Sequence, residues 1–264
     1  MNMNAVKIIA LVSLIAGGCW LFGLGLTVYD QFFHGPTASL SKEIKPKETA
    51  VNEQQLHLVA LGDSLTRGTG DETGKGYVGY TLDALRKKTK RPIQVTNLAI
   101  KGQQSTQLVT QIQKVEVQRQ LRQADFVFMT IGGNDLFQGG EALRNFSRAR
   151  IDEAKKVYLK NLDSVFRTIR AINPRAVVFY IGLYNPFNQL NNAKMTSAIV
   201  REWNYASAEV AARYPNIIAV PTYDLFELHV NDYLYSDQFH PNKEGYKLIG
   251  ERVASLISFS KGGK

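Results

Sequence analysis

Five short apolar runs, each followed by a stretch with helical periodicity, constrain the fold of this 264-residue chain more than any other feature. The runs predict strands at Leu56–Leu61, Ile93–Leu98, Phe126–Ile131, Val177–Leu183 and Ile217–Val220. The periodic stretches predict helices at Val78–Thr89, Thr106–Arg122, Ile151–Ala171, Ala193–Ala212 and Lys243–Ser258. Strands that alternate with helices favour a parallel sheet with helices on both faces. We therefore expect an α/β protein, a three-layer α/β/α sandwich around a five-stranded parallel sheet.

The residues that build disulfides and metal sites are scarce. Cys19 is the only cysteine and the chain has four histidines. One cysteine excludes a disulfide framework and a cysteine-based zinc site. We therefore expect neither a metal nor an organic cofactor to hold the fold together.

The N-terminal residues differ from the rest. Residues 8–29 contain no charged side chain, and as a helix they would extend about 33 Å, enough to cross a bilayer core. The stretch is longer than a signal-peptide core, and no convincing Ala-x-Ala cleavage site follows it. We expect residues 1–34 to be an N-terminal transmembrane anchor or uncleaved signal, with the folded domain extracellular, or secreted if the segment is cleaved. Residues 35–55 are polar and hold two prolines, which predicts a tether before a domain at residues 56–264.

A basic cluster lies at the end of the first predicted helix of the domain, and its members are Arg86, Lys87, Lys88, Lys90 and Arg91. Cations are favoured at a helix C-terminus, so the cluster can simply be a solvated helix end. A second interpretation is contact with an anionic surface such as phospholipid or cell-wall polymer. No nucleic-acid motif accompanies the cluster, so we expect no nucleic-acid partner.

Candidate reactive groups follow the first three predicted strands, where ligands bind in parallel sheets. Ser64 lies in Gly62-Asp63-Ser64-Leu65, at a strand-to-helix turn that can project its hydroxyl into a cleft; a serine there is also a common helix cap. Gly102 follows the second strand and can present its N–H to a ligand, although loop glycines are ordinary. Asn134 follows Gly132-Gly133, and its amide can bind a developing oxyanion or belong to a simple turn.

A possible base lies just before the last predicted helix, in Ser236-Asp237-Gln238-Phe239-His240-Pro241. An Asp three residues before a His can accept the Nδ1–H of that His and leave Nε2 as a base. An isolated pair of this kind is often a chance match. The Asp237–His240 pair gains weight because Ser64, Gly102 and Asn134 occur in the same chain.

Together, GDSL at 62–65, Gly102, GGND at 132–135 and D-x-x-H-P at 237–241 resemble the sequence blocks of the SGNH (GDSL) hydrolase superfamily. The resemblance spans Leu56–Ser258 and is closest to membrane-anchored or secreted GDSL lipase/acylhydrolase-like proteins of Gram-positive bacteria. It implies a flavodoxin-like fold and a carboxylic ester hydrolase. It further implies Ser64 as nucleophile, His240 as base and then acid, and Asp237 as the residue that orients His240. The implied oxyanion hole comprises the N–H groups of Ser64 and Gly102 and the Asn134 amide.

The substrate stays open at this level. We favour an acyl-lipid or lysophospholipid-like ester; the alternatives are a carbohydrate O-acetylesterase acting on cell-wall polysaccharide and a non-catalytic envelope-binding module. Loops 136–150 and 184–192 should line the cleft, with apolar area from Phe137, Phe146, Tyr184, Phe187 and Leu190. The asparagines at 185, 188, 191 and 192 can bond sugar hydroxyls or serve as turn residues. Asp63 is expected to bond the backbone that holds Ser64.

Overall fold

The structure, a computed structural model, describes residues 55–137, 147–189 and 192–259, together with 7, 16–18, 20 and 22. Contacts divide the chain into two units, Met1–Asn52 and Glu53–Lys264, and the second holds the whole sheet. No helix among the described residues is both long and apolar enough to cross a bilayer. Most of the expected anchor, and all of the expected tether except Gln55, lie outside the described residues.

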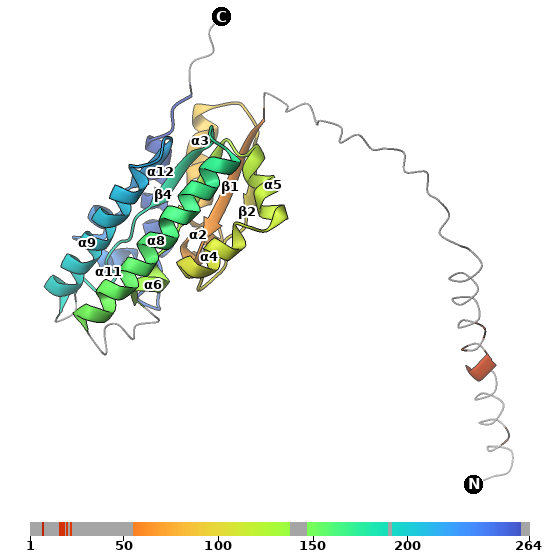
Figure 1. Cartoon of the computed structure of the whole chain (residues 1–264), viewed down its shortest axis with the longest axis horizontal. Coiled ribbons are helices and arrows are strands. Elements are labelled where there is room, and N and C mark those ends of the chain that lie inside the picture. The colour runs from red at the N-terminus through yellow and green to blue at the C-terminus, as the bar shows by residue number, and fades with distance from the viewer. Residues whose placement is uncertain are drawn as a thin grey trace, which may run out of the picture. The chain divides into compact units, whose positions relative to one another are not determined.

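A five-stranded sheet forms the centre of the second unit (Figure 1). Its strands are all parallel and lie in the order β2-β1-β3-β4-β5. Their bounds are β1 Leu56–Gly62, β2 Ile93–Asn97, β3 Phe126–Thr130, β4 Val177–Ile181 and β5 Ile217–Val220. All five expected strands are present, and each begins at the expected residue.

Helices cover both faces of the sheet, which confirms the three-layer α/β prediction (Figure 1). Alternate residues of β1 show how: Val59 and Leu61 pack into one core cluster, and Leu58 and Ala60 into the other. The first cluster takes its helical residues mainly from α4 Ser105–Gln111, α5 Val115–Gln123, α8 Arg148–Ile172 and α9 Ala193–Ala211. The second takes its helical residues mainly from α3 Gly76–Lys88 and α12 Lys243–Ser255.

The expected helix Thr106–Arg122 is wrong, because the segment forms two helices, α4 and α5, separated at residues 112–114. Leu108 and Ile112 are buried four residues apart, as are Val117 and Leu121. The step from Ile112 to Val117 is five residues, which no single helix face accommodates. The first helix ends there and a second helix begins, so that both apolar pairs face the sheet.

Four one-turn helices were not predicted: α2 Ser64–Arg67, α6 Gly133–Phe137, α10 Tyr223–Phe226 and α11 Val230–Tyr233. Figure 1 shows α2, α6 and α11 at the end of the sheet where its strands finish. Helices of four or five residues are too short to show an apolar period.

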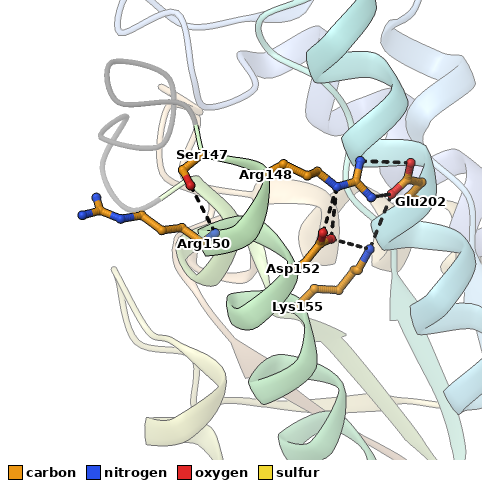
Figure 2. Close-up of polar contacts among 6 residues, drawn as sticks. All are labelled: Ser147, Arg148, Arg150, Asp152, Lys155 and Glu202. Carbon is orange, nitrogen blue, oxygen red and sulfur yellow. Dashed lines mark hydrogen bonds and ion pairs between the residues drawn. The ribbon is translucent and has the colours of Figure 1, made fainter.

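A group of charged side chains joins the start of α8 to α9 (Figure 2). Arg148 binds Glu202 at 2.5 Å and Asp152 at 3.0 Å, and Lys155 contacts both carboxylates. Hydrogen bonds from Arg148 lower the pKa of both acids. The group therefore links the first two turns of α8 to the neighbouring helix α9.

The basic cluster lies at the opposite end of the sheet from α2, beside the start of β1, because Leu56 N–H donates to the carbonyl of Pro92 at 2.8 Å. Arg86 pairs with Asp83 at 3.2 Å. Lys88 Nζ donates to the carbonyls of Ala254 and Ile257 at the end of α12. Part of the cluster therefore serves the fold.

Candidate active site

Ser64 lies at the sharp turn where β1 ends and α2 begins. Gly62 has φ of 114°, and a Cβ there would lie 1.8 Å from the Thr130 carbonyl oxygen on the neighbouring strand. Only glycine fits this approach. The same carbonyl accepts the N–H of Asp63 at 3.2 Å, which fixes the start of the turn.

Asp63 caps α2, as its expected structural role requires. Its Oδ1 accepts the N–H of Leu65 at 3.0 Å and the hydroxyl of Thr130 at 2.7 Å. Burial raises the pKa of Asp63 to about 6, although both hydrogen bonds act in the opposite direction. This carboxyl group holds the turn and is distinct from the one that contacts the histidine.

His240 lies over Ser64 and contacts it directly. Its Nε2 is 2.8 Å from Ser64 Oγ, and its Nδ1 is 2.7 Å from Asp237 Oδ2. With Nδ1 protonated, Nδ1–H donates to Asp237 and Nε2 accepts the serine hydroxyl. The structure thus brings these three predicted side chains into one hydrogen-bonded relay across 176 residues of sequence.

The backbone around Asp237 keeps this carboxylate charged. Its Oδ1 accepts the N–H groups of Phe239 at 3.0 Å and His240 at 2.9 Å, in a turn where Gln238 has φ of 54°. Burial acts to raise the pKa of Asp237, but the hydrogen bonds from His240 and the two N–H groups lower it overall. An ionised Asp237 selects the Nδ1–H tautomer of the imidazole.

Two residues hold the loop at residues 235–241, called here the histidine loop: Gly70, which the sequence analysis did not single out, and Tyr184, which it expected in the cleft lining. Gly70 has φ of 95°, and a Cβ there would lie 2.6 Å from the Pro241 carbonyl oxygen and 3.0 Å from His240 Cβ. Tyr184 donates its hydroxyl hydrogen to the Phe239 carbonyl and stacks on Phe226 with ring centroids 4.2 Å apart. Both contacts set the height of the imidazole above Ser64.

The expected oxyanion donors surround the same cleft. Gly102, with φ of 74°, lines it together with Ser64 and Asn134. Asn134 Nδ2 donates to the Gln103 carbonyl at 2.9 Å, which uses one amide hydrogen and fixes the amide plane. The second hydrogen of that amide is left for a ligand. This bond also couples the Gly102 loop to the Asn134 loop.

The cleft has a volume of about 580 Å³. An aromatic wall of Phe137, Phe187 and Phe239 borders it, with ring centroids 5.2 to 6.0 Å apart. Polar groups also line it, namely Thr69, Lys101, Gln189, Asn231 and Gln238. Beside Ser64 lies a second, smaller pocket of about 20 Å³, lined in part by Leu183, Tyr184 and Pro186.

The loop residues proposed from the sequence divide by role. Phe137 and Phe187 line the cleft as expected, whereas Tyr184 is buried against Phe226 and borders only the smaller pocket. Asn185 is buried and donates to Thr196 and Ser197. Asn188 donates to the Glu227 carbonyl. These two asparagines serve the turn rather than a sugar. Asn192 is the residue directly before α9 and is not among the described residues that line the cleft. The other candidates, Phe146, Leu190 and residue 191, lie outside the described residues.

Comparisons with known proteins give the family of the chain. Residues 60–248 match the GDSL-like Lipase/Acylhydrolase family. The chain is similar to the uncharacterized protein YpmR of Bacillus subtilis, with 37% identity over 84% of this chain and 88% of that protein. It is also similar to the spore germination lipase LipC of Bacillus licheniformis, with 27% identity over 75% of this chain and 94% of that protein.

Solved structures show the same fold. The lipase Lip_vut3 from a goat rumen metagenome superposes with a TM-score of 0.71 at 25% identity, covering 78% of this chain and 99% of that one. A catalytic mutant of the acetylxylan esterase Axe2 from Geobacillus stearothermophilus gives 0.60 at 19% identity, covering 78% and 95%. The chain belongs to the GDSL-like lipase/acylhydrolase family and is a carboxylic ester hydrolase.

Proposed function

We propose that Ser64, His240 and Asp237 hydrolyse the ester through an acyl-serine intermediate. The observation that carries the proposal is the continuous relay, 2.8 Å from Ser64 Oγ to His240 Nε2 and 2.7 Å from His240 Nδ1 to Asp237 Oδ2. A serine hydroxyl is a weak nucleophile at neutral pH and needs such an adjacent base.

The reaction follows from this geometry in two halves. Ser64 Oγ attacks the carbonyl carbon while its proton passes to His240 Nε2, and the new oxyanion binds the Ser64 and Gly102 N–H groups and the Asn134 amide. The tetrahedral intermediate collapses, and Nε2–H protonates the departing alcohol. A water then attacks the acyl-serine, with His240 again as base, and releases the acid and the free serine.

For the substrate, we propose an acyl-lipid or lysophospholipid-like ester. The aromatic wall of Phe137, Phe187 and Phe239 supports this assignment, since it offers apolar surface directly beside Ser64 and His240. A cleft of this size can take a ligand much larger than acetate.

The smaller pocket beside Ser64 favours a second candidate, an O-acetylesterase acting on cell-wall polysaccharide. Its volume of about 20 Å³ holds a group the size of one water or methyl group. In this alternative the methyl of the acetyl group occupies the smaller pocket and a sugar occupies the cleft.

A chain-length series separates the two candidates. Hydrolysis of p-nitrophenyl acetate, butanoate, octanoate and dodecanoate is compared in the wild type and in Phe187→Ala. A lipid-type enzyme prefers the longer acyl groups, and Phe187→Ala reduces that preference; Tyr205→Ala, at an exposed tyrosine of α9 that does not line the cleft, is the matched control. Activity confined to acetate, with acetate release from wall polysaccharide, would instead select the O-acetylesterase. Failure of a fluorophosphonate probe to label Ser64 would favour the non-catalytic binding module.

We also propose that residues 1–34 anchor the protein in the membrane once, with residues 35–55 as tether and the catalytic domain extracellular. The uncharged stretch at residues 8–29 supports this proposal. Protease added to intact protoplasts should remove a C-terminal tag from membrane-bound protein. A tag that is protected until the membrane is lysed would place the domain inside the cell.

A further inference from the structure

Two of the expected oxyanion donors come from different segments of the chain. Gly102 lies between β2 and α4, and Asn134 lies in α6, which follows β3. The sheet places both segments at one edge, but the distance between the two donors also depends on side-chain hydrogen bonds from one segment to the other. Those hydrogen bonds are described next.

Asp135, the residue after Asn134, binds the start of α4. Its Oδ2 accepts the N–H of Ser105 at 3.0 Å, and its Oδ1 accepts the hydroxyl of Ser105 at 2.5 Å. Burial raises the pKa of Asp135, and the hydrogen bonds from Ser105 act in the opposite direction. Hydrogen bonds to an ionised acceptor are about twice as strong as neutral ones. The ionised carboxylate is therefore the form that holds Ser105 best.

Ser105 is also held from α8. It is buried, and its Oγ accepts a hydrogen bond from Asn161 Nδ2 at 3.0 Å. Ser105 thus accepts from α8 and donates twice to Asp135. Because Ser105 lies only three residues after Gly102, a fixed Ser105 restricts the position of the Gly102 N–H.

Asn134 binds the same loop through two further contacts. Its Nδ2 donates to the Gln103 carbonyl at 2.9 Å, and its own carbonyl accepts Gln104 Nε2 at 3.4 Å. A shift of the Gly102 loop would carry the Gln103 carbonyl with it, and the Asn134 amide would have to follow. Both donors therefore depend on the position of one loop.

We propose that Asp135 is a positioning residue for the oxyanion hole, because through Ser105 it fixes the Gly102 loop against the Asn134 amide. This inference rests on the proposed acyl-serine mechanism and adds a residue to it. Asp135 is not among the described residues that line either pocket, so it acts through its neighbours rather than on the substrate.

The test compares Asp135→Ala and Ser105→Ala with the wild type, as the full chain in dodecyl maltoside with p-nitrophenyl butanoate. Acylation and deacylation use the same oxyanion hole, so kcat and kcat/KM should fall by the same factor. We expect a fall of about 10- to 30-fold for Asp135→Ala, less than for loss of a donor, because the donors are displaced rather than removed. Ser105→Ala keeps its backbone N–H and should lose about three- to fivefold.

Asp125→Ala is the matched control. The Oδ2 of Asp125 accepts the N–H of His57 at 2.8 Å, a contact of the same kind directly before β3, and Asp125 is not among the described residues that line the cleft. Both Asp→Ala variants should lower the urea midpoint, but Asp125→Ala should keep kcat within about twofold of wild type. Equal kcat in these two variants would overturn the inference.

A double-mutant cycle with Asn134→Ala distinguishes positioning from a general structural role. If Asp135 places the Asn134 amide, Asp135→Ala should cost at most about threefold in kcat when that amide is already absent, since the remaining effect runs through Gly102. The same cost in both backgrounds would show that Asp135 acts independently of the amide and would contradict the proposal.

Absence of ester hydrolysis by the wild type contradicts the proposed function instead. Amide hydrogen exchange then decides the inference separately: Asp135→Ala should speed exchange across residues 102–105 at least about threefold, and Asp125→Ala should leave it unchanged. Equal exchange in wild type and Asp135→Ala would overturn the inference. If Asp135→Ala does not fold, Ser105→Ala decides the matter, and unchanged kcat and exchange in that variant would count against it.

Discussion

Gly70 packs against His240, the proposed base, and is not among the described residues that line the cleft, so replacing it tests how the site is held. A Cβ added at Gly70 would lie 2.6 Å from the Pro241 carbonyl oxygen and 3.0 Å from His240 Cβ. The first of these atoms is backbone and cannot rotate away. The histidine loop must therefore move in Gly70→Ala.

The distance that the histidine loop must move in Gly70→Ala sets the expected decrease in kcat/KM. Restoring a separation of 3.0 Å to the carbonyl requires a shift of about 0.4 Å, and a misplacement of about 1 Å at a reacting group costs about 10²-fold in rate. We expect Gly70→Ala to lower kcat/KM about tenfold. Because alanine is strained at the positive φ of residue 70, Gly70→Ala should also lower the unfolding free energy by about 1–2 kcal/mol.

Gly74→Ala separates these two effects. Gly74 has φ of 69°, but a Cβ there meets no atom within 4 Å. The variant therefore carries the backbone strain without the clash, and its kcat/KM should stay within about twofold of wild type because its backbone need not shift. The assay is hydrolysis of p-nitrophenyl butanoate, with urea denaturation of both variants. Equal kcat/KM in the two variants would refute the argument that Gly70 positions His240.

Three further predictions concern the turn and the oxyanion donors. Ser64→Ala should abolish ester hydrolysis with an unchanged urea midpoint, and residual turnover would remove Ser64 as nucleophile. Asn134→Ala should lower kcat about 10²- to 10³-fold, the scale of one lost oxyanion donor; a loss under threefold would show that this amide points elsewhere. Burial raises the pKa of Asp63 from its ordinary value of 3.8 to about 6 in the folded protein. Its stabilising contribution is therefore complete below pH 3.8 and is lost as pH rises through 6. The loss amounts to about 3 kcal/mol of unfolding free energy, and Asp63→Asn should remove it; equal pH slopes for the two proteins in urea denaturation between pH 4 and 7 would contradict this.

The strands were predictable because buried parallel strands need apolar side chains on both faces. Val177–Ile181, for example, is a continuous apolar run that supplies Val178 and Tyr180 to one cluster and Phe179 and Ile181 to the other. The break between α4 and α5 carried a signal too, the five-residue step from Ile112 to Val117. Neither proline nor glycine marks this break, so composition alone does not reveal it.

The aromatic wall shows what sequence reasoning lacked. Phe137 and Phe187 were expected at the cleft because each follows a strand, but Phe239 comes from the histidine loop, which follows no strand directly. The ring contacts among them depend on the position of that loop, which involves Gly70 and Tyr184. Sequence spacing does not encode such contacts between distant segments.

The groups of the candidate site are therefore fixed in two different ways. Ser64, Gly102 and Asn134 each follow a strand, and the parallel sheet places all three at one edge through backbone hydrogen bonds. His240 instead depends on a short bridge between Leu234 and Pro241, on the Tyr184 hydroxyl and on the space left by Gly70. Because these contacts come from separate segments of the chain, small changes around the loop should alter catalysis before they alter stability.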